Sequence, residues 1–320
     1  MNEVQLIDKY LKRLTKKNTS SQGLNDDIFF DKSKKLAISI DTYVEKVHFP
    51  NLKSPDLVIK KVLRSSLSDL ICKGVKPKYY FLSASGNSKS FSKKNLKKIS
   101  NALSSEQKRF DIELSGGDTV NSSINSFTCC VVGFSNNIVK RHNSKIGDDI
   151  YITGYLGDSY LGLQILKNKI SLANNLRKYF ISKYYMPSIN LKMIDFLHKF
   201  ANTSIDISDG LLIDLDKMTK QQKYGFLIRL DDINISNQLK NFLSKNKRFK
   251  IENTIFNGDD YEIIFTSHKK NRSLISKYVK NENLKIQRIG EILKKHQDSC
   301  ILKGNQKFKI NKNLGYNHQF

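Results

Sequence analysis

The segment 205–218, IDISDGLLIDLDKM, constrains the fold because an apolar run leads through acidic residues and a glycine directly into a helical pattern. Apolar residues recur at helical spacing from position 211, which predicts a helix with one face in a core. Asp206, Ser208 and Asp209 then lie at a strand-to-helix junction, where Gly210 lets a ligand approach the backbone. Carboxylates there suit hard cations, and free helix N–H groups suit phosphate. Helix capping explains the same residues equally well.

Acidic residues recur in comparable positions elsewhere, at predicted strand ends, beside glycines or inside apolar stretches. Those outside the segment 205–218 are Asp26, Asp27, Asp41, Asp69, Asp118, Asp259 and Asp260. The chain has no set of zinc ligands, no GxSxG or GxGxxG motif and no Walker A loop. Many acids without soft ligands indicate Mg²⁺ bound through oxygen, and Mg²⁺ commonly bridges carboxylates to phosphates. The pattern therefore favours phosphoryl transfer.

The length of 320 residues allows a substantial core and predicts about two domains. A turn and a new strand follow residue 140, so we place the boundary between domains 1–143 and 144–320. No apolar run is long enough to span a bilayer, and the N-terminus lacks a signal-peptide core. We therefore expect a cytoplasmic protein that does not contact a membrane.

The net charge of +25 raises the possibility of a nucleic-acid partner. However, lysines are spread along the whole chain, often beside Asn and Ile, and a compositional bias explains them equally well. We expect no nucleic-acid partner; binding that weakens steeply with salt would support the alternative. The four cysteines fit no CxxC metal site and are interpreted as buried thiols; they are Cys72, Cys129, Cys130 and Cys300.

Periodicity places the other elements. An amphipathic helix is expected over 3–16, and the Gly-Gly-Asp sequence at 116–118 is expected in a turn after a short strand. Asp148 and Asp149 are also assigned to a turn. Further helices are predicted over 54–73, 93–103 and after 157, with strands over 36–41, 81–86, 127–134, 150–153 and two later apolar runs.

Taken in order, the motifs resemble those of the thiamine-monophosphate kinase family. They are NDD (25–27), SIDTYVEKVHF (39–49), LSDLICKGVKP (67–77), SGGDT (115–119), GDDIYITGYLGDS (147–159), IDISDGLLIDL (205–215), NGDDYEIIF (257–265), IGEI (289–292) and a terminal GYNHQF. The resemblance implies an aminoimidazole-ribonucleotide-synthetase-like architecture: an N-terminal α/β domain, whose sheet pairs across a homodimer, and a C-terminal α+β domain. It also implies phosphorylation of thiamine monophosphate by ATP, with several Mg²⁺ ions, in a cleft between the domains.

The resemblance also implies roles for individual residues. The implied Mg²⁺ ligands are Asp27, Ser39, Ile40 (through its carbonyl), Asp41, Asp69, Asp118, Asp206 and Asp209. The implied ATP contacts are Gly117, Asp118, Arg141 and Ser208. The implied substrate contacts are His48, Asp259 and Tyr316. No general base is expected, because the acceptor is already a phosphate anion.

Three residues depart from the family pattern: Asn25 replaces a glycine, Ile40 a threonine and Asp259 a longer glutamate. Within the same fold, a selenophosphate synthetase would need a reactive cysteine in a glycine-rich N-terminal segment, whereas the first cysteine here is Cys72. An aminoimidazole-ribonucleotide synthetase or a hydrogenase-maturation protein fits the 205–215 and 257–265 motifs less well. A relative that only binds nucleotide is a further alternative, which the retained acids oppose.

Overall fold

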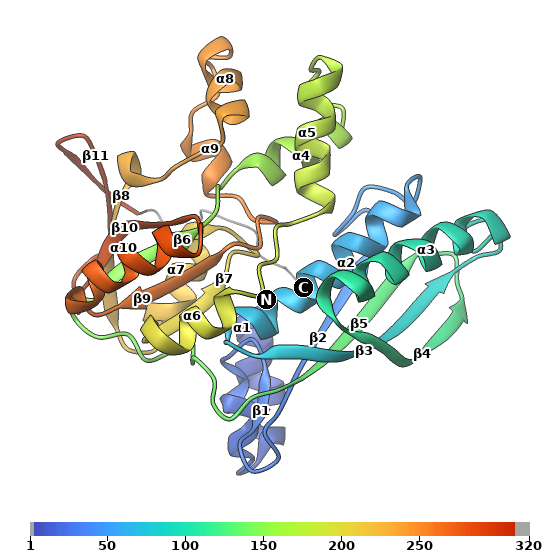
Figure 1. Cartoon of the computed structure of the whole chain (residues 1–320), viewed down its shortest axis with the longest axis horizontal. Coiled ribbons are helices and arrows are strands. Elements are labelled where there is room, and N and C mark those ends of the chain that lie inside the picture. The colour runs from blue at the N-terminus through green and yellow to red at the C-terminus, as the bar shows by residue number, and fades with distance from the viewer. Residues whose placement is uncertain (1–2, 311–320) are drawn as a thin grey trace.

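The computed structural model describes residues 3–310, which contain two β-sheets with helices packed against them (Figure 1). The first sheet has the strand order β1-β2-β5-β3-β4. Its strands are β1 (Phe29–Asp31), β2 (Leu36–Val44), β3 (Lys76–Gly86), β4 (Glu113–Asn121) and β5 (Ser126–Phe134). β3 and β4 are parallel, and the other neighbours are antiparallel.

Helices α2 (Pro55–Cys72) and α3 (Lys93–Phe110) cover one face of this sheet (Figure 1). Alternate residues of β5 are buried on that side, as expected of a strand with one face in a core. Pro55 begins α2, and Gly74, at φ +74°, follows its end. α2 is buried along most of its length, including polar residues such as Lys61, because both halves of the molecule pack against it.

The opposite face of the first sheet exposes large apolar side chains. Strand register places Ile40, Phe81, Val120 and Phe134 on this face, and they are 40–67% exposed. Exposed apolar side chains gathered on one face of a sheet are typical of a surface that another molecule covers.

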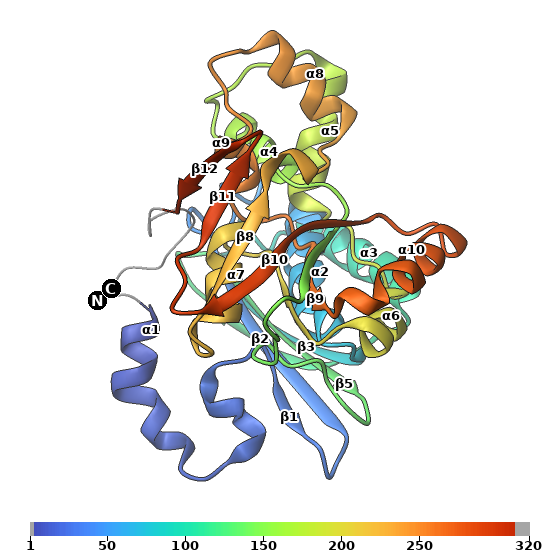
Figure 2. The same cartoon turned by 90° about the vertical axis from the view of Figure 1, so that its left-hand side faces the viewer.

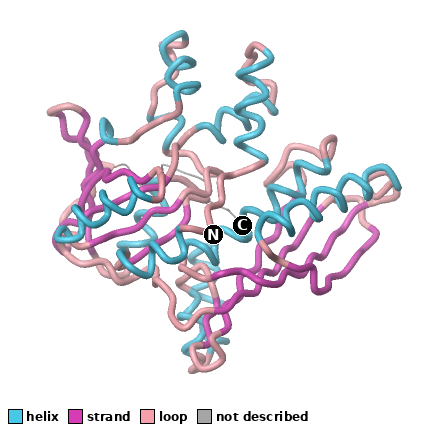
Figure 3. The backbone as a smooth tube through the Cα atoms, viewed as in Figure 1, coloured by secondary structure: helices cyan, strands magenta, loops and turns pink. Residues whose placement is uncertain are grey.

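The second sheet has the order β12-β11-β8-β10-β6-β9-β7, with β11 parallel to β8 and the other pairs antiparallel. Its strands are β6 (Asp149–Thr153), β7 (Thr203–Asp206), β8 (Tyr224–Arg229), β9 (Ile263–Ser267), β10 (Ile286–Lys295), β11 (Cys300–Lys303) and β12 (Gln306–Lys309). Its helices are α4 (Asp158–Leu166), α5 (Asn174–Tyr185), α6 (Met193–Phe200), α7 (Leu211–Lys220), α8 (Asn237–Lys245), α9 (Glu252–Ile255) and α10 (Arg272–Asn281). Figure 3 shows the strands gathered in two groups with helices around them.

The hydrophobic core does not divide at residue 143. One cluster joins Val58 and Leu67 of α2 to Tyr151 of β6 and Phe265 of β9. A second cluster lies within the C-terminal half and includes Ile264, Leu211 and Phe226. The mixed α/β fold with two sheets is therefore confirmed, whereas the division into domains 1–143 and 144–320 stays a prediction.

The helix expected over 3–16 differs from the prediction. Residues Glu3–Leu6 form α1, Ile7–Leu11 a π-helical turn and Lys12–Thr15 a 3₁₀ turn, and none of their side chains is buried. Figure 2 shows this segment at one side of the molecule. Val4, Tyr10, Leu11 and Leu14 are 42–67% exposed within the described residues, so the helical spacing of apolar residues did not by itself predict a buried face.

Three further expectations require correction. Gly116 and Gly117 lie inside the edge strand β4 rather than in a turn. Glycine is needed at position 117 because a Cβ there would come within 1.9 Å of the Leu82 carbonyl of β3. Asp149 is buried in β6, where Arg272 neutralises it at 2.6 Å. Cys130 is half-buried, unlike the other three cysteines, because it faces the exposed side of the sheet.

Candidate functional site

Three carboxylates from separate elements line one side of a cleft of about 580 Å³: Asp41 of β2, Asp69 of α2 and Asp206 at the end of β7. The Ser39 hydroxyl donates a hydrogen bond to Asp69. The second oxygen of Asp206, Oδ2, has no hydrogen-bond partner among the described residues. We refer to these three side chains as the unpaired acids, because no salt bridge within residues 3–310 reaches them.

Burial and mutual repulsion make the unpaired acids resist ionisation. Burial raises the pKa of Asp41 to about 6 and, together with the nearby charge of Asp27, raises the pKa of Asp206 to about 8. Burial, followed by the charges of Asp41 and Asp206, raises the pKa of Asp69 well above its usual value. A cation placed among these groups would relieve their mutual repulsion.

Three other carboxylates of the cleft are each held by a basic side chain, and we call them the paired acids: Asp27, Asp209 and Asp259. Asp27 lies 2.6 Å from Lys73 and also pairs with Arg141. Although burial opposes it, Arg141 and then Lys73 keep the pKa of Asp27 below its usual range. Lys73 is completely buried and contacts Asp26 as well, at 2.9 Å.

Two ion pairs and two backbone hydrogen bonds fix Asp209 at the start of α7. Lys217 lies 2.5 Å from Asp209 and 2.8 Å from Asp214. The second Asp214 oxygen accepts the backbone N–H groups of Asp209 and Gly210 at 3.0 Å. Gly210 is at φ +130°, and a Cβ there would come within 2.2 Å of the Phe256 carbonyl. The glycine is therefore required by close packing of the backbone, and Asp214 satisfies helix N–H groups that would otherwise lack partners.

The substrate side predicted from sequence also faces the cleft. Asp259 accepts a hydrogen bond from Lys61 at 2.5 Å. The His48 Nδ1 accepts the N–H of Val44 at 3.0 Å, and its ring lies edge-on to Tyr43. Tyr316 lies outside the described residues.

The predicted nucleotide and metal residues fall into two groups. Ile40, Arg141 and Ser208 line the cleft with the acids. Ser39 is buried beneath them and contacts Asp69.

Gly117 and Asp118 are exposed on β4 and are not among the residues that line the cleft. Asp118 pairs with Ser83, which pairs with Thr128 and then Thr42 of β2. Asp118 is therefore three inter-strand spacings, about 14 Å, from Thr42 of β2. A single chain therefore does not bring Asp118 to the unpaired acids.

Sequence reasoning missed the basic partners Lys61, Lys73 and Lys217. Each is one of 55 lysines and arginines, so composition conceals them. The only available signal was the apolar surrounding of Lys61 and Lys73 in the 54–73 helix region, because a lysine there must find a partner.

The cleft residues fit Mg²⁺ by their chemistry. The unpaired acids offer hard oxygen ligands and one unsatisfied buried oxygen. Within residues 3–310 no three Asp, Glu, His or Cys side chains are arranged to hold one ion by themselves. This open arrangement suits a cation that completes its coordination with water and substrate phosphates.

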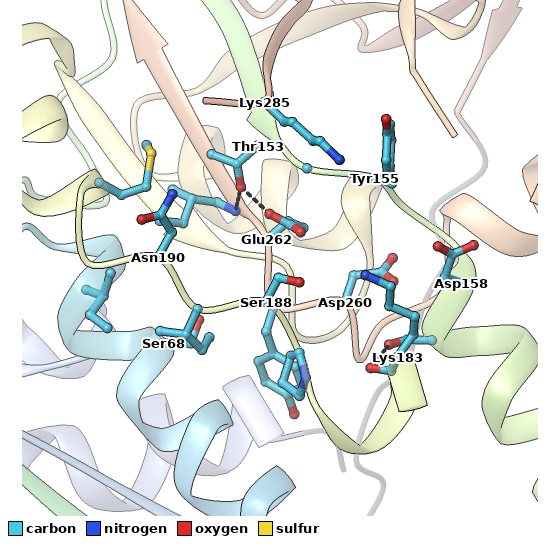
Figure 4. A pocket seen from close by; sticks show the side chains of 18 of the residues that line it. Ser68, Thr153, Tyr155, Asp158, Lys183, Ser188, Asn190, Asp260, Glu262 and Lys285 are labelled. Atoms are coloured by element: carbon cyan, nitrogen blue, oxygen red, sulfur yellow. Dashed lines mark hydrogen bonds between the residues drawn. The ribbon is translucent and has the colours of Figure 1, made fainter. Parts of the chain in front are cut away.

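A second cavity of about 250 Å³ shares Tyr261 with the cleft as a lining residue. Figure 4 shows this second cavity. Its ionisable residues are Asp158, Lys183, Asp260, Glu262 and Lys285. Figure 4 shows Thr153 beside Glu262, to whose carboxylate it donates a hydrogen bond at 2.5 Å. Burial raises the pKa of Glu262 to about 7. This cavity carries both signs of charge, unlike the acidic side of the cleft.

The thiol chemistry expected of a selenophosphate synthetase is not supported by Cys72. Its side chain is fully buried, and burial raises the pKa of the thiol well above its usual value. A thiol of this kind is unreactive.

Comparisons with known proteins point to one family, and the matches to whole relatives cover nearly the whole chain. The family described as "AIR synthase related protein, N-terminal domain" matches residues 25–135. A curated thiamine-monophosphate kinase of Buchnera aphidicola subsp. Acyrthosiphon pisum (strain APS) is 37% identical, covering 99% of this chain and 98% of the relative. Its counterpart from Buchnera aphidicola subsp. Schizaphis graminum (strain Sg) is 36% identical, with the same coverage.

A solved structure described as "AaThiL complexed with AMPPCP and TMP" superposes with a TM-score of 0.85 at 25% identity, covering 99% of this chain and 97% of the other. Among residues 3–310, no helix is long and apolar enough to cross a membrane.

Proposed function

Since this chain belongs to the thiamine-monophosphate kinase family, we propose that it transfers the terminal phosphoryl group of ATP to thiamine monophosphate, which forms thiamine diphosphate and ADP. The observation that carries the proposal is the cleft where Asp41, Asp69 and Asp206 meet with no basic side chain of residues 3–310 paired to them, in a chain that matches its relative over 99% of its length. Two polyanions must meet in this reaction, and their repulsion at short range is large.

The unpaired acids, with Asp27 and Asp209, would hold Mg²⁺, and the bound ions would neutralise the phosphates of both substrates. Asp41 on β2 and Asp69 on α2 would both be ligands of such an ion, because both line the cleft. Arg141 and Ser208 are proposed to contact ATP, because both line the cleft beside the acids. No side chain needs to remove a proton, since the acceptor is already an anion.

On the acceptor side, His48 and Asp259 are proposed to contact thiamine monophosphate, together with Tyr316 beyond the described residues. His48 and Asp259 line the same cleft as the unpaired acids. An aromatic ring such as Tyr316 could stack on the heteroaromatic part of the substrate.

We propose that the protein acts as a homodimer through the exposed face of the first sheet. Ile40, Phe81, Val120 and Phe134 form an apolar surface that a second copy would bury. Gly117 and Asp118 lie at the edge of the same sheet, remote from the acids of their own chain. Their proposed contacts with ATP and Mg²⁺ are therefore assigned to the cleft of the second copy. The use of ATP as co-substrate favours the cytoplasm as the site of the reaction.

The test is ADP release from ATP with and without thiamine monophosphate, with the thiamine product identified by chromatography. We expect thiamine diphosphate to form only when Mg²⁺ and both substrates are present. Turnover of ATP with another acceptor alone would retain the fold and reject the substrate. A protein that neither binds nor turns over nucleotide would contradict the proposed function altogether.

A further inference from the structure

We propose that Lys61 is a positioning residue for the acceptor substrate: it holds Asp259 and, through Tyr184, the turn that carries His48. This inference rests on the proposed function and adds a residue that the family resemblance did not supply. It predicts that Lys61 controls the binding of thiamine monophosphate and has little influence on ATP.

Lys61 is unusual because it lies in the middle of α2 with only 1% of its surface exposed. A lysine is almost never buried this fully unless its ammonium group is paired, because removing the charge from water is costly. Its neighbour on the same helix, Lys60, keeps partial exposure and approaches Glu106 only to 3.9 Å. The two lysines therefore serve different purposes, and Lys60 provides a matched control.

The ammonium group of Lys61 contacts two other segments of the chain. It donates to Asp259 Oδ1 at 2.5 Å and to the Tyr184 carbonyl at 3.4 Å. It also lies 4.0 Å from the centre of the Tyr184 ring and 5.3 Å from that of Tyr261, distances at which a cation is attracted to an aromatic face. Lys61 thus joins α2 to the end of α5 and to the segment 257–261.

Tyr184 extends this network to the other predicted substrate residue. Its hydroxyl donates to the His48 carbonyl at 2.8 Å, and the Tyr184 side chain is 1% exposed. His48 in turn accepts the Val44 N–H at 3.0 Å. A displacement of Lys61 or Tyr184 would therefore change the positions of both His48 and Asp259.

The backbone around Asp259 has an unfavourable conformation that other contacts must hold in place. Asp259 and Tyr261 are at φ +70° and +51°, a conformation that residues other than glycine adopt at a cost. Their N–H groups donate to the carbonyls of Ser208 and Ile207, each at 2.9 Å. Lys61 adds the contact that fixes the Asp259 side chain. Because Lys61 and the Tyr261 hydroxyl both contact Oδ1, Oδ2 is left for a donor or cation of the substrate.

The ATP side of the cleft uses other basic residues. Asp27 is held by Lys73 and Arg141, and Asp209 by Lys217. Lys61 itself contacts no residue proposed to contact ATP, and Ser208 meets Asp259 only through its backbone carbonyl. A substitution of Lys61 should therefore weaken the binding of thiamine monophosphate and leave the binding of ATP nearly unchanged.

The experiment compares Lys61→Met with Lys60→Met in steady-state kinetics and in calorimetric titration with thiamine monophosphate and, separately, with a non-hydrolysable ATP analogue. For Lys61→Met we expect the KM and Kd for thiamine monophosphate to rise about 30-fold or more, because Asp259 loses the ion pair that fixes it and the Tyr184 carbonyl loses its donor. The KM for ATP should change by less than about threefold. Lys60→Met should behave as wild type for both substrates. Equal effects of Lys61→Met on both substrates would overturn the proposal.

Two further variants keep the test decisive if Lys61→Met fails to fold. Tyr184→Phe removes only the hydroxyl that holds His48 and should raise the KM for thiamine monophosphate several-fold, with the KM for ATP unchanged. In a cycle of Asp259→Asn, Lys61→Arg and the double variant, the effects on that KM should be clearly less than additive. Additive effects, or a Tyr184→Phe variant identical to wild type, would reject the network. A wild-type protein that makes no thiamine diphosphate would instead reject the proposed function, and this inference with it.

Discussion

The two groups of carboxylates in the cleft differ in how their charge is balanced. The paired acids Asp27, Asp209 and Asp259 each touch a lysine or arginine of the same chain. The unpaired acids Asp41, Asp69 and Asp206 have hydrogen-bond donors and other carboxylates as neighbours, and no salt bridge within residues 3–310 reaches them. Their pKa values are raised by burial, whereas that of Asp27 is lowered by Arg141 and Lys73.

This difference assigns the two groups distinct physical tasks. The paired acids hold segments of chain in place: Lys73, at the end of α2, joins that helix to Asp27, Lys61 joins α2 to Asp259, and Lys217 fixes Asp209 at the start of α7. The unpaired acids destabilise the metal-free protein and become favourable only when a cation arrives. The positions most important for turnover should therefore be those that contribute least to the stability of the metal-free protein.

The largest expected effect is on turnover, from Asp69→Asn. Because several kcal/mol of charge neutralisation are lost, kcat should fall by roughly three orders of magnitude. Urea unfolding in the presence of EDTA should show stability equal to or above that of wild type, since a repelled carboxylate has been removed. A variant that is unfolded under conditions where wild type is folded would show that Asp69 is structural.

The opposite result is expected when a partner of the paired acids is removed. Lys73→Met should lower the free energy of unfolding by about 3–5 kcal/mol, because it leaves Asp26 and Asp27 buried without their shared cation. Urea denaturation of the EDTA-treated protein measures the change. Lys76→Met is the control, because Lys76 pairs with the exposed Asp111, and its stability should match wild type. Equal stability of the two variants would remove the distinction between the groups.

The metal-free protein should lose stability as pH rises from about 4 to 8. In this range the unfolded chain releases protons that Asp41 and Asp206 retain in the folded state, with pKa values of about 6 and 8. Each group then contributes a slope of up to about −1.4 kcal/mol per pH unit until its folded pKa is passed. Asp206→Asn should flatten the slope between pH 6 and 8, as followed by urea unfolding in EDTA.

Divalent cations should reverse this loss. Mg²⁺ at about 100 times its Kd is expected to add about 2.7 kcal/mol at pH 8, and less at lower pH. A gain that is independent of pH would indicate that the cation binds away from the unpaired acids.

The smallest expected effect is a few-fold change in Mg²⁺ affinity, from Lys217→Met. The substitution frees the partly exposed Asp209 and also leaves the buried Asp214 with only its two backbone N–H donors, so the free energy of unfolding should fall by about 1–3 kcal/mol. Calorimetric titration should show a few-fold higher affinity for Mg²⁺, because a competing cation has been removed. The exposed Lys220 on the same helix gives the control, and Lys220→Met should leave the Mg²⁺ affinity unchanged.

The sequence by itself determined much of this protein. The ordered motifs identified the family that comparison later established, and periodicity located β2, α2, β5 and α7. It also singled out the unpaired acids Asp41, Asp69 and Asp206. These inferences succeeded because they depend on local spacing, on turn residues and on the order of motifs, all of which can be read along a single chain.

Only the tertiary structure decided which charges are balanced. Lys61 and Asp259 are 198 positions apart, and Lys73 is far in sequence from Asp27, so no local pattern pairs them. Gly117 and Asp118 lie on an exposed edge strand and Asp149 is buried beside Arg272, whereas the sequence placed all three in turns. The free energy of a charge depends on what surrounds it in space, and contacts between distant segments exist only after the chain has folded.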